Sequence, residues 1–134
     1  MFQKYLFLKI CLCVTLLSVF VAAGCSNKKA PTGTVSGTVK YKGEPVTVGT
    51  IMFMDPATKL GGSAWLGADG SYTITASIEV GEYNVAFPPP PAPPPGSGAE
   101  RILSPLPSKY YVPEKGTVKF TVVAGKNTAD FDLE

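Results

Sequence analysis

The feature of this 134-residue chain that most restricts its fold is a series of short runs in which apolar and polar residues alternate. After Cys25 these runs recur about every 8 to 12 residues, with turn residues between them, and no stretch has the periodicity of an amphipathic helix. The runs cover residues 33–41, 46–54, 63–67, 71–75, 80–87, 116–123 and 128–133. The pattern predicts an all-β domain, a seven-stranded antiparallel β-sandwich.

Three turns are expected between these runs. Residues 42–45 predict a turn because Gly43 accepts a positive φ at no steric cost. Asp69 and Gly70 form the dipeptide that most readily closes a tight hairpin. Residues 124–127 are predicted to close a last hairpin between the two C-terminal runs.

The alternation also predicts which large side chains point into the sandwich. In the run 80–87, Tyr83 falls on the apolar face and is expected in the core. Phe131 and Leu133 are expected to point inward from the last run. Trp65 lies in a short strand, where a buried or half-buried position is the default for so large a side chain.

Residues 1–24 have the organisation of a signal peptide. Lys4 and Lys9 are the only charges before Lys28, and the apolar stretch 10–23 follows them. This stretch is shorter than the roughly 20 apolar residues that a membrane-spanning helix needs, and it ends in small residues that suit a peptidase. We therefore expect the segment to be removed.

The string Val21, Ala22, Ala23, Gly24, Cys25 resembles the lipobox of bacterial lipoproteins, with Ala22 where Leu is usual. The resemblance implies that a signal peptidase recognises residues 21–24 and that Cys25 receives a diacylglyceryl group. Cys11 and Cys13 lie inside the removed segment, so the mature chain would keep a single cysteine that cannot form an internal disulfide. An ordinary signal peptide with a chance cysteine, or an uncleaved anchor helix, is the alternative.

Residues 25–32 are then a lipidated tether that lifts the domain off the bilayer. Ser26 follows the cysteine where Asp would be a retention signal, and the best-known sorting rule then favours the outer membrane. The expected location is the cell envelope, outside the cytoplasm.

Charge excludes some partners. The chain has 12 basic and 10 acidic residues, and Lys4 and Lys9 belong to the signal peptide. The mature chain therefore has equal numbers of basic and acidic residues, and its net charge is close to zero. A neutral surface without clusters gives no footprint for nucleic acid or for anionic lipid. Membrane attachment would therefore depend on the acyl chains, and the length after Cys25 suits a single domain.

The proline-rich loop, residues 88–98, interrupts the alternating pattern. Residues 88–95 hold seven prolines in eight positions, which favours a stiff polyproline II segment of ~25 Å, and Gly96 and Gly98 loosen its end. A tolerated loop between two strands is the favoured interpretation. A docking ligand for an aromatic-lined groove is the alternative.

Several short strings together resemble one domain family. They are residues 33–39 (GTVSGTV), 43–46 (GEPV), 69–72 (DGSY), 81–85 (GEYNV), 107–110 (PSKY) and 130–133 (DFDL). The chain resembles the carboxypeptidase regulatory-like domain, in particular the small bacterial lipoproteins of that type. The resemblance covers nearly all of residues 33–134 and implies a transthyretin-like, prealbumin-like β-sandwich. It implies no peptidase, because the family name refers to an accessory domain beside one.

The chain contains no histidine, which removes the usual general base, the nucleophile–histidine pairs and most zinc sites. Transthyretin-like folds include a hydrolase of a purine breakdown product, but that enzyme relies on histidines. Asp130 and Asp132 would share an outward face and could hold a weak calcium ion; solvated edge charges are the favoured interpretation. We expect no enzyme activity, no cofactor and no metal.

The sequence thus predicts a non-enzymatic envelope lipoprotein with a structural or protein-interaction role. A carbohydrate-binding module is the alternative, because exposed aromatic rings can stack on sugars. Tyr110 and Tyr111 lie beside the proline-rich loop and are expected to be exposed; with Trp65 they are the candidate contacts for a glycan or an envelope protein.

Overall fold

The computed structural model describes residues 29–134, which form nine β-strands and two short 3-10 helices. The elements are β1 (Thr32–Tyr41), β2 (Glu44–Pro45), β3 (Thr50–Met54), β4 (Gly61–Trp65), β5 (Ser71–Glu79), β6 (Gly81–Ala86), η1 (Ser108–Tyr110), η2 (Pro113–Lys115), β7 (Val118–Val122), β8 (Gly125–Thr128) and β9 (Phe131–Leu133). The predicted signal peptide, Cys25 and tether residues 26–28 lie outside the described residues. No helix within residues 29–134 combines the length and apolar character that a bilayer crossing requires.

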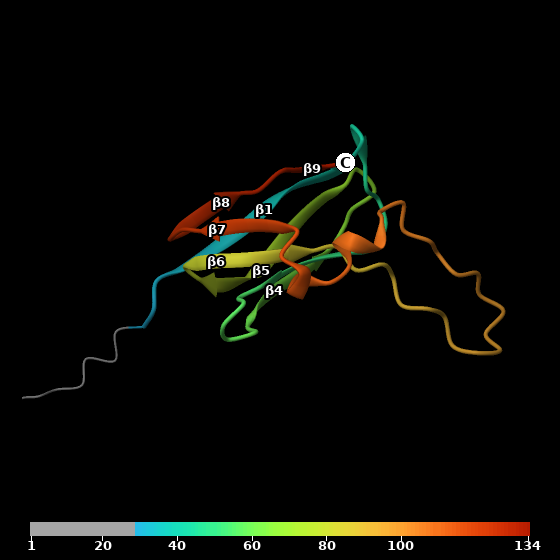
Figure 1. Ribbon diagram of the computed structural model, residues 1–134, viewed down its shortest axis with the longest axis horizontal. Helices are drawn as coiled ribbons and strands as arrows, with labels where there is room; N and C mark the ends of the chain where they lie inside the picture. The colour runs from blue at the N-terminus through green and yellow to red at the C-terminus, as the bar shows by residue number, and fades with distance from the viewer. Residues whose placement is uncertain (1–28) are drawn as a thin grey trace, which may run out of the picture.

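The strands build two sheets that share one core (Figure 1). One sheet is centred on β1, which pairs antiparallel with β2 and β5 and parallel with β8 and β9. The other sheet has the order β4-β3-β6-β7 and is antiparallel throughout. The prediction of an all-β domain is confirmed. The prediction of seven strands that are all antiparallel is wrong, because β2 and β8 are additional strands and because β8 and β9 pair parallel with β1.

The first predicted turn is confirmed. Lys42 and Gly43 connect β1 to β2 and have φ values of 52° and 84°. Two consecutive residues with positive φ form the turn whose twist matches an antiparallel strand pair. Pro45 then ends β2.

The turn at Asp69 and Gly70 forms, but it does not close a hairpin. Gly70 has a φ of 75°, and the Asp69 carboxylate accepts hydrogen bonds from the Ser71 hydroxyl (2.6 Å) and the Ser71 N–H (3.0 Å), which lower the pKa of Asp69. The strand before the turn pairs with β3 and the strand after it pairs with β1. The chain changes sheet here because the N–H of Val39, in β1, donates to the Gly70 carbonyl at 2.9 Å.

The predicted C-terminal hairpin around residues 124–127 does not form either. β7 belongs to one sheet and β8 and β9 to the other. The Asn127 side chain holds the crossing: its Oδ1 accepts from the Val123 N–H at 2.9 Å, and its Nδ2 donates to the carbonyls of Val123 (2.8 Å) and Thr34 (3.1 Å). Because these bonds join the turn to β1, the chain runs along β1 instead of folding back on β7.

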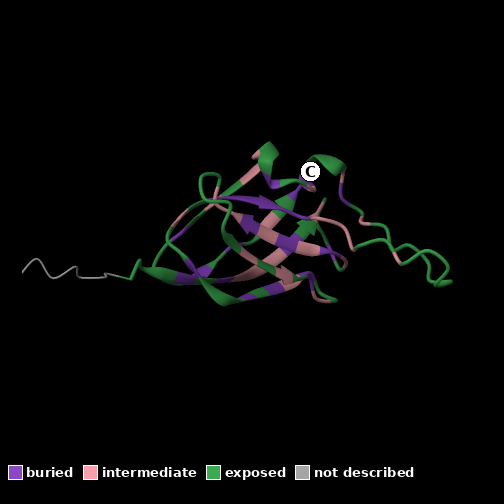
Figure 2. Cartoon of the chain, turned by 90° about the horizontal axis from the view of Figure 1, so that it is seen from below, coloured by how far each residue is buried: buried purple, intermediate pink, exposed green. Residues whose placement is uncertain are grey.

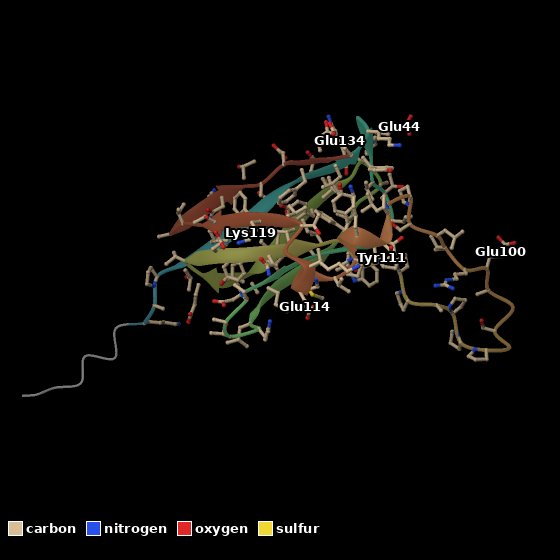
Figure 3. The ribbon with its side chains drawn as sticks, viewed as in Figure 1. Glu44, Glu100, Tyr111, Glu114, Lys119 and Glu134 are labelled. Carbon is tan, nitrogen blue, oxygen red and sulfur yellow. The ribbon has the colours of Figure 1, made fainter. Side chains whose placement is uncertain are left out.

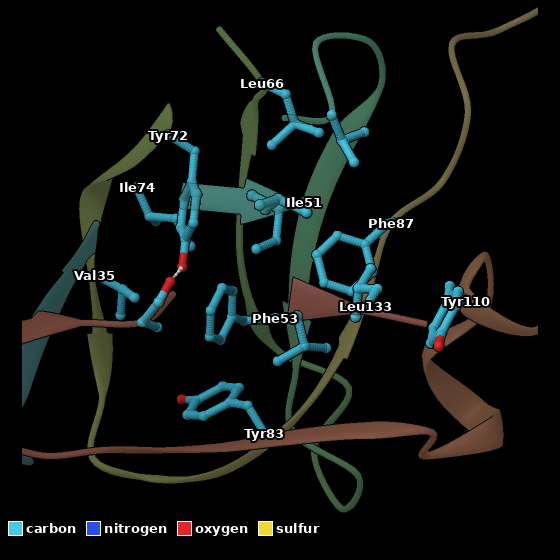
Figure 4. Close-up of a cluster of buried hydrophobic side chains, with 14 of the residues drawn as sticks. Val35, Ile51, Phe53, Leu66, Tyr72, Ile74, Tyr83, Phe87, Tyr110 and Leu133 are labelled. Atoms are coloured by element: carbon cyan, nitrogen blue, oxygen red, sulfur yellow. Dashed lines mark hydrogen bonds between the residues drawn. The ribbon is translucent and has the colours of Figure 1, made fainter. Parts of the chain in front are cut away.

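Aromatic rings fill the centre of the core (Figure 4). The ring centroid of Phe53 lies 6.3 Å from that of Tyr72, 6.4 Å from Tyr83 and 6.2 Å from Phe131. Tyr83 and Leu133 are buried, as predicted, and Phe131 is half-buried against the same cluster. Edge-to-face and tilted rings at such separations add to the stabilisation from apolar burial.

Residues 87–107, between β6 and η1, contain no strand or helix, as the proline content predicts. Figures 1 and 2 show this segment projecting from the end of the sandwich opposite to the residues that enter β1. The proline-rich loop and the start of β1 therefore lie at opposite ends of the long axis.

Asn127→Ala is expected to lower the free energy of unfolding by about 1 to 3 kcal/mol, because it removes the side-chain partner of a part-buried N–H and of two part-buried carbonyls. Urea unfolding should show a lower midpoint with an unchanged slope. Lys126→Ala, at the exposed neighbouring position, is the control and should change the free energy by less than about 0.5 kcal/mol. Equal midpoints for the two variants would contradict the role assigned to Asn127.

Candidate functional site

The structure separates the residues that the sequence grouped as candidates. The lipobox residues Val21, Ala22, Ala23 and Gly24, and the lipidation candidate Cys25, lie outside the described residues, so their roles stay predictions. Trp65 lies on β4, and Tyr110 and Tyr111 lie at η1 on the other side of the proline-rich loop. The three aromatic residues do not form one platform.

Tyr110 is part of the core, and the expectation that it is exposed is wrong. Only 7% of its surface is accessible, and its ring meets Phe87 edge-on with centroids 6.4 Å apart. Its hydroxyl donates to the Glu134 carbonyl at 2.7 Å, and its own carbonyl accepts from the Phe87 N–H at 2.7 Å. The turn of η1 after Pro107 points the ring inward, which proximity to a proline-rich loop could not reveal.

Tyr111 is half-buried and supports the far end of the loop. Its hydroxyl donates to the Leu106 carbonyl at 2.7 Å, and Leu106 is itself buried. At the near end, the Thr50 N–H donates to the Pro88 carbonyl at 3.1 Å. Tyr111, shown at the base of the loop in Figure 3, therefore has a structural role whether or not it also contacts a partner.

Among residues 29–134, Trp65 is the aromatic side chain that is mostly exposed to solvent, and the expected buried or half-buried position is wrong for it. It is 66% exposed. The inward positions of β4 are Gly62 and Ala64, and a Cβ at Gly62 would lie 2.8 Å from a methyl of Ile74 and 3.1 Å from a methyl of Ile78. Since only small residues fit on that face, the register turns Trp65 outward.

A shallow hollow of about 220 Å³ lies on the outer face beside β4. Met52 and Met54 of β3 line it together with Gly61 and Ser63 of β4, and Lys59 stands at its edge. Trp65 is two residues further along the same strand. The arrangement offers an exposed ring next to a small apolar depression, with one cation nearby.

Residues 87–107, the distal loop, contain the proline-rich loop and carry exposed apolar side chains. Ile102 is 57% exposed and Leu103 is 74% exposed. Among the described residues, the hydrogen bonds of residues 89–105 stay within the loop and its own ends, such as that from the Ser97 N–H to the Pro94 carbonyl at 3.2 Å. The loop is therefore held at its two ends and free along its length.

Asp130 is already engaged, which weakens the calcium alternative. Its Oδ1 accepts from the Thr38 N–H at 2.8 Å and from the Thr38 hydroxyl at 2.9 Å. Asp132 Oδ1 accepts from the Gly43 N–H at 3.3 Å. Within residues 29–134, no three His, Cys, Asp or Glu residues lie close enough together to hold a metal ion. The two carboxylates join the C-terminal strand to β1 and the turn after it.

No protein-family model matches the sequence, and no curated protein matches it. Among the crystal structures that are similar in part are DUF3823 family proteins from Parabacteroides merdae (18% identity, TM-score 0.45, 78% of this chain and 46% of that chain) and from Bacteroides ovatus (22%, 0.45, 76% and 44%). A leucine-rich repeat protein from Bacteroides thetaiotaomicron is also similar in part (13%, 0.44, 78% and 12%).

The chain spans less than half the length of each of these proteins. Their similarity carries no argument about function. The all-β architecture follows from the strand pairing itself, and the resemblance to the carboxypeptidase regulatory-like domain stays a prediction.

Tyr111→Phe is expected to loosen the proline-rich loop while lowering the free energy of unfolding by only about 0.5 to 1.5 kcal/mol, because it removes one hydrogen bond to Leu106. Limited proteolysis should cut within residues 89–105 faster than in the wild type. Tyr41→Phe is the matched control, since Tyr41 is half-buried and its hydroxyl donates no hydrogen bond to the described residues. Identical cleavage rates for both variants would show that Tyr111 does not hold the loop.

Proposed function

We propose that this chain is an exported bacterial lipoprotein, cleaved before Cys25 and anchored by a diacylglyceryl group on that cysteine. Its β-sandwich acts as a non-enzymatic structural or protein-interaction module at a membrane surface of the cell envelope, and the residue after Cys25 favours the outer membrane. We further propose that the β-sandwich is of the carboxypeptidase regulatory-like, transthyretin-like type, which the short sequence motifs resemble.

The observation that carries this proposal is the position of the start of β1, which the predicted tether joins, relative to the proline-rich loop. β1 begins at Thr32, the last residue of the predicted tether, and runs for 10 residues through the domain. A strand of that length spans roughly 33 Å. The proline-rich loop leaves the sandwich at the opposite end in both views (Figures 1 and 2). A domain anchored through its N-terminus would hold this loop away from the bilayer.

The distal loop has the properties of a contact surface. Its proline content limits the backbone freedom that binding would otherwise remove, so less conformational entropy is lost on association. Ile102 and Leu103 give it exposed apolar side chains, and both of its ends are held by the sandwich. The sequence supports a role without catalysis, because the chain has no histidine and its one cysteine after the signal peptide is the proposed anchor.

Intact mass of the protein extracted from membranes tests the anchor. The wild type is expected to lack residues 1–24 and to carry an acylated glyceryl group, whereas Cys25→Ser should lack that added mass and leave the membrane fraction. Cys11→Ser, inside the removed segment, is the matched control and should give the same mature mass as the wild type. A wild-type protein with an unmodified Cys25 would overturn the proposal.

Carbohydrate binding is the second candidate, and the exposure of Trp65 beside the hollow on β3 and β4 favours it. Of the three candidate contacts, Tyr110 is buried and Tyr111 is half-buried, so Trp65 is the residue that supports this candidate. Tyr110 is unsuitable for testing it, because truncating a core ring would destabilise the fold.

Trp65→Ala is expected to abolish retardation in affinity electrophoresis through soluble polysaccharides if sugars stack on the indole ring. The matched control is Val123→Ala, which shortens another exposed apolar side chain away from β4 and should migrate as the wild type. A wild type that is not retarded by any glycan of a broad panel would exclude the carbohydrate role.

A further inference from the structure

The two sides of the sandwich differ in how they close. On the side of β4 and β5 the sheets meet directly, since Gly62 of β4 faces the methyl groups of Ile74 and Ile78. On the other side, β7 and β9 leave an open cleft of about 540 Å³ between them. Val118 and Lys119 line the cleft from one sheet, and residues 130–134 line it from the other.

Both strands that border this cleft have a free edge. Among the described strands, β7 pairs with β6 and β9 pairs with β1, and each has no partner on its other side. The free edge of a strand presents unpaired N–H and carbonyl groups, which are a template for a further strand. Here the two edges face one cleft from opposite sheets.

The floor of the cleft is apolar and continuous with the core. Phe131 is half-buried, and its ring centroid lies 6.2 Å from that of Phe120 and 5.6 Å from that of Phe87. Val118, at the start of β7, is half-buried beside them. An inserted strand could therefore bury alternate apolar side chains on this floor while its backbone pairs with an edge.

The rim of the cleft is negatively charged. Asp130, Asp132 and Glu134 are exposed at alternate positions along the β9 side. Lys119 on the facing strand is paired with Glu82 at 2.9 Å and is the one cation among the residues that line the cleft. Figure 3 shows Lys119 on β7 and Glu134 at the end of β9. A partner that carries positive charge at alternate positions would match this rim.

We propose that the cleft between β7 and β9, the seam, binds an extended segment of another protein in which basic and apolar residues alternate. The segment adds a strand of about five residues to one of the two edges. This names the kind of partner for the interaction role proposed above, and it rests on that role but not on the lipid anchor.

The probe for the test is a labelled peptide of alternating lysine and valine, seven residues long, with both ends blocked. Fluorescence anisotropy with the membrane-extracted protein should show saturable binding that weakens as the salt concentration rises to about 0.5 M. Two control peptides separate charge from strand pairing. Glutamate in place of lysine reverses the charge, and proline in place of valine removes backbone donors while keeping the charge.

The double variant Asp132→Asn, Glu134→Gln should weaken binding of the lysine–valine peptide about fivefold. Glu79→Gln with Glu100→Gln removes two exposed carboxylates that do not line the seam, one at the end of β5 and one in the segment between β6 and η1, and should leave the affinity unchanged. Hydrogen exchange should slow at backbone amides of β7 or β9 when the peptide is bound. Because the substitutions are conservative, all of these variants are expected to fold.

The proposal is overturned if the lysine–valine peptide does not bind, if the proline peptide binds equally well, or if the protected amides lie outside β7 and β9. These outcomes are independent of the mass of the N-terminus. The experiments can therefore distinguish failure of the proposed lipid anchor from failure of the proposed peptide binding at the seam.

Discussion

The hydrogen bonds along both edges of β1 organise this molecule. β5 and β2 pair with one edge and β8 and β9 with the other, so a whole sheet depends on a single strand. This pairing requires the C-terminal segment to lie very close to the backbone of β1, and two glycines of β1 permit it. A Cβ at Gly33 would lie 2.6 Å from Asn127 Nδ2, and one at Gly37 would lie 2.6 Å from the carbonyl carbon of Ala129. The glycines in this part of the sequence therefore serve packing against the C-terminal segment as well as turns.

The pairing of the C-terminal segment with β1 also shapes the surface. Since Asn127 directs the chain across to β1, β7 is left at the edge of the other sheet, and the seam opens between the two strands. The buried Tyr72 hydroxyl donates to the Ala129 carbonyl at 2.7 Å and fixes the same segment from the core side; burial and the nearby Asp130 raise the pKa of Tyr72. The crossing that completes one sheet thus creates the open side of the sandwich.

The proposed roles divide the surface by its distance from the tether. The proline-rich loop lies at the far end, and its two ends are held by Tyr111 and by the Pro88 carbonyl, which keeps the projecting segment oriented. The seam and Trp65 both lie on the body of the sandwich. The seam lies beside β7, and Trp65 lies on β4, the strand at the opposite edge of the same sheet. A lipid anchor at Cys25 would leave the loop outermost.

The alternation of residues by itself determined that the chain is all-β, where most strands lie, and that Tyr83 and Leu133 point inward. These features are local, because side-chain direction along a strand has a period of two. Tertiary contacts decided which strands pair. The Val39 N–H donates to the Gly70 carbonyl, and the Asn127 side chain donates to the Thr34 carbonyl. At both turns the chain therefore crosses from one sheet to the other instead of forming the predicted hairpin. The exposure of Trp65 and the burial of Tyr110 depended likewise on what lay opposite them. The local pattern determines which face of a strand a side chain lies on, but only the assembled fold determines whether that face contacts solvent or another strand.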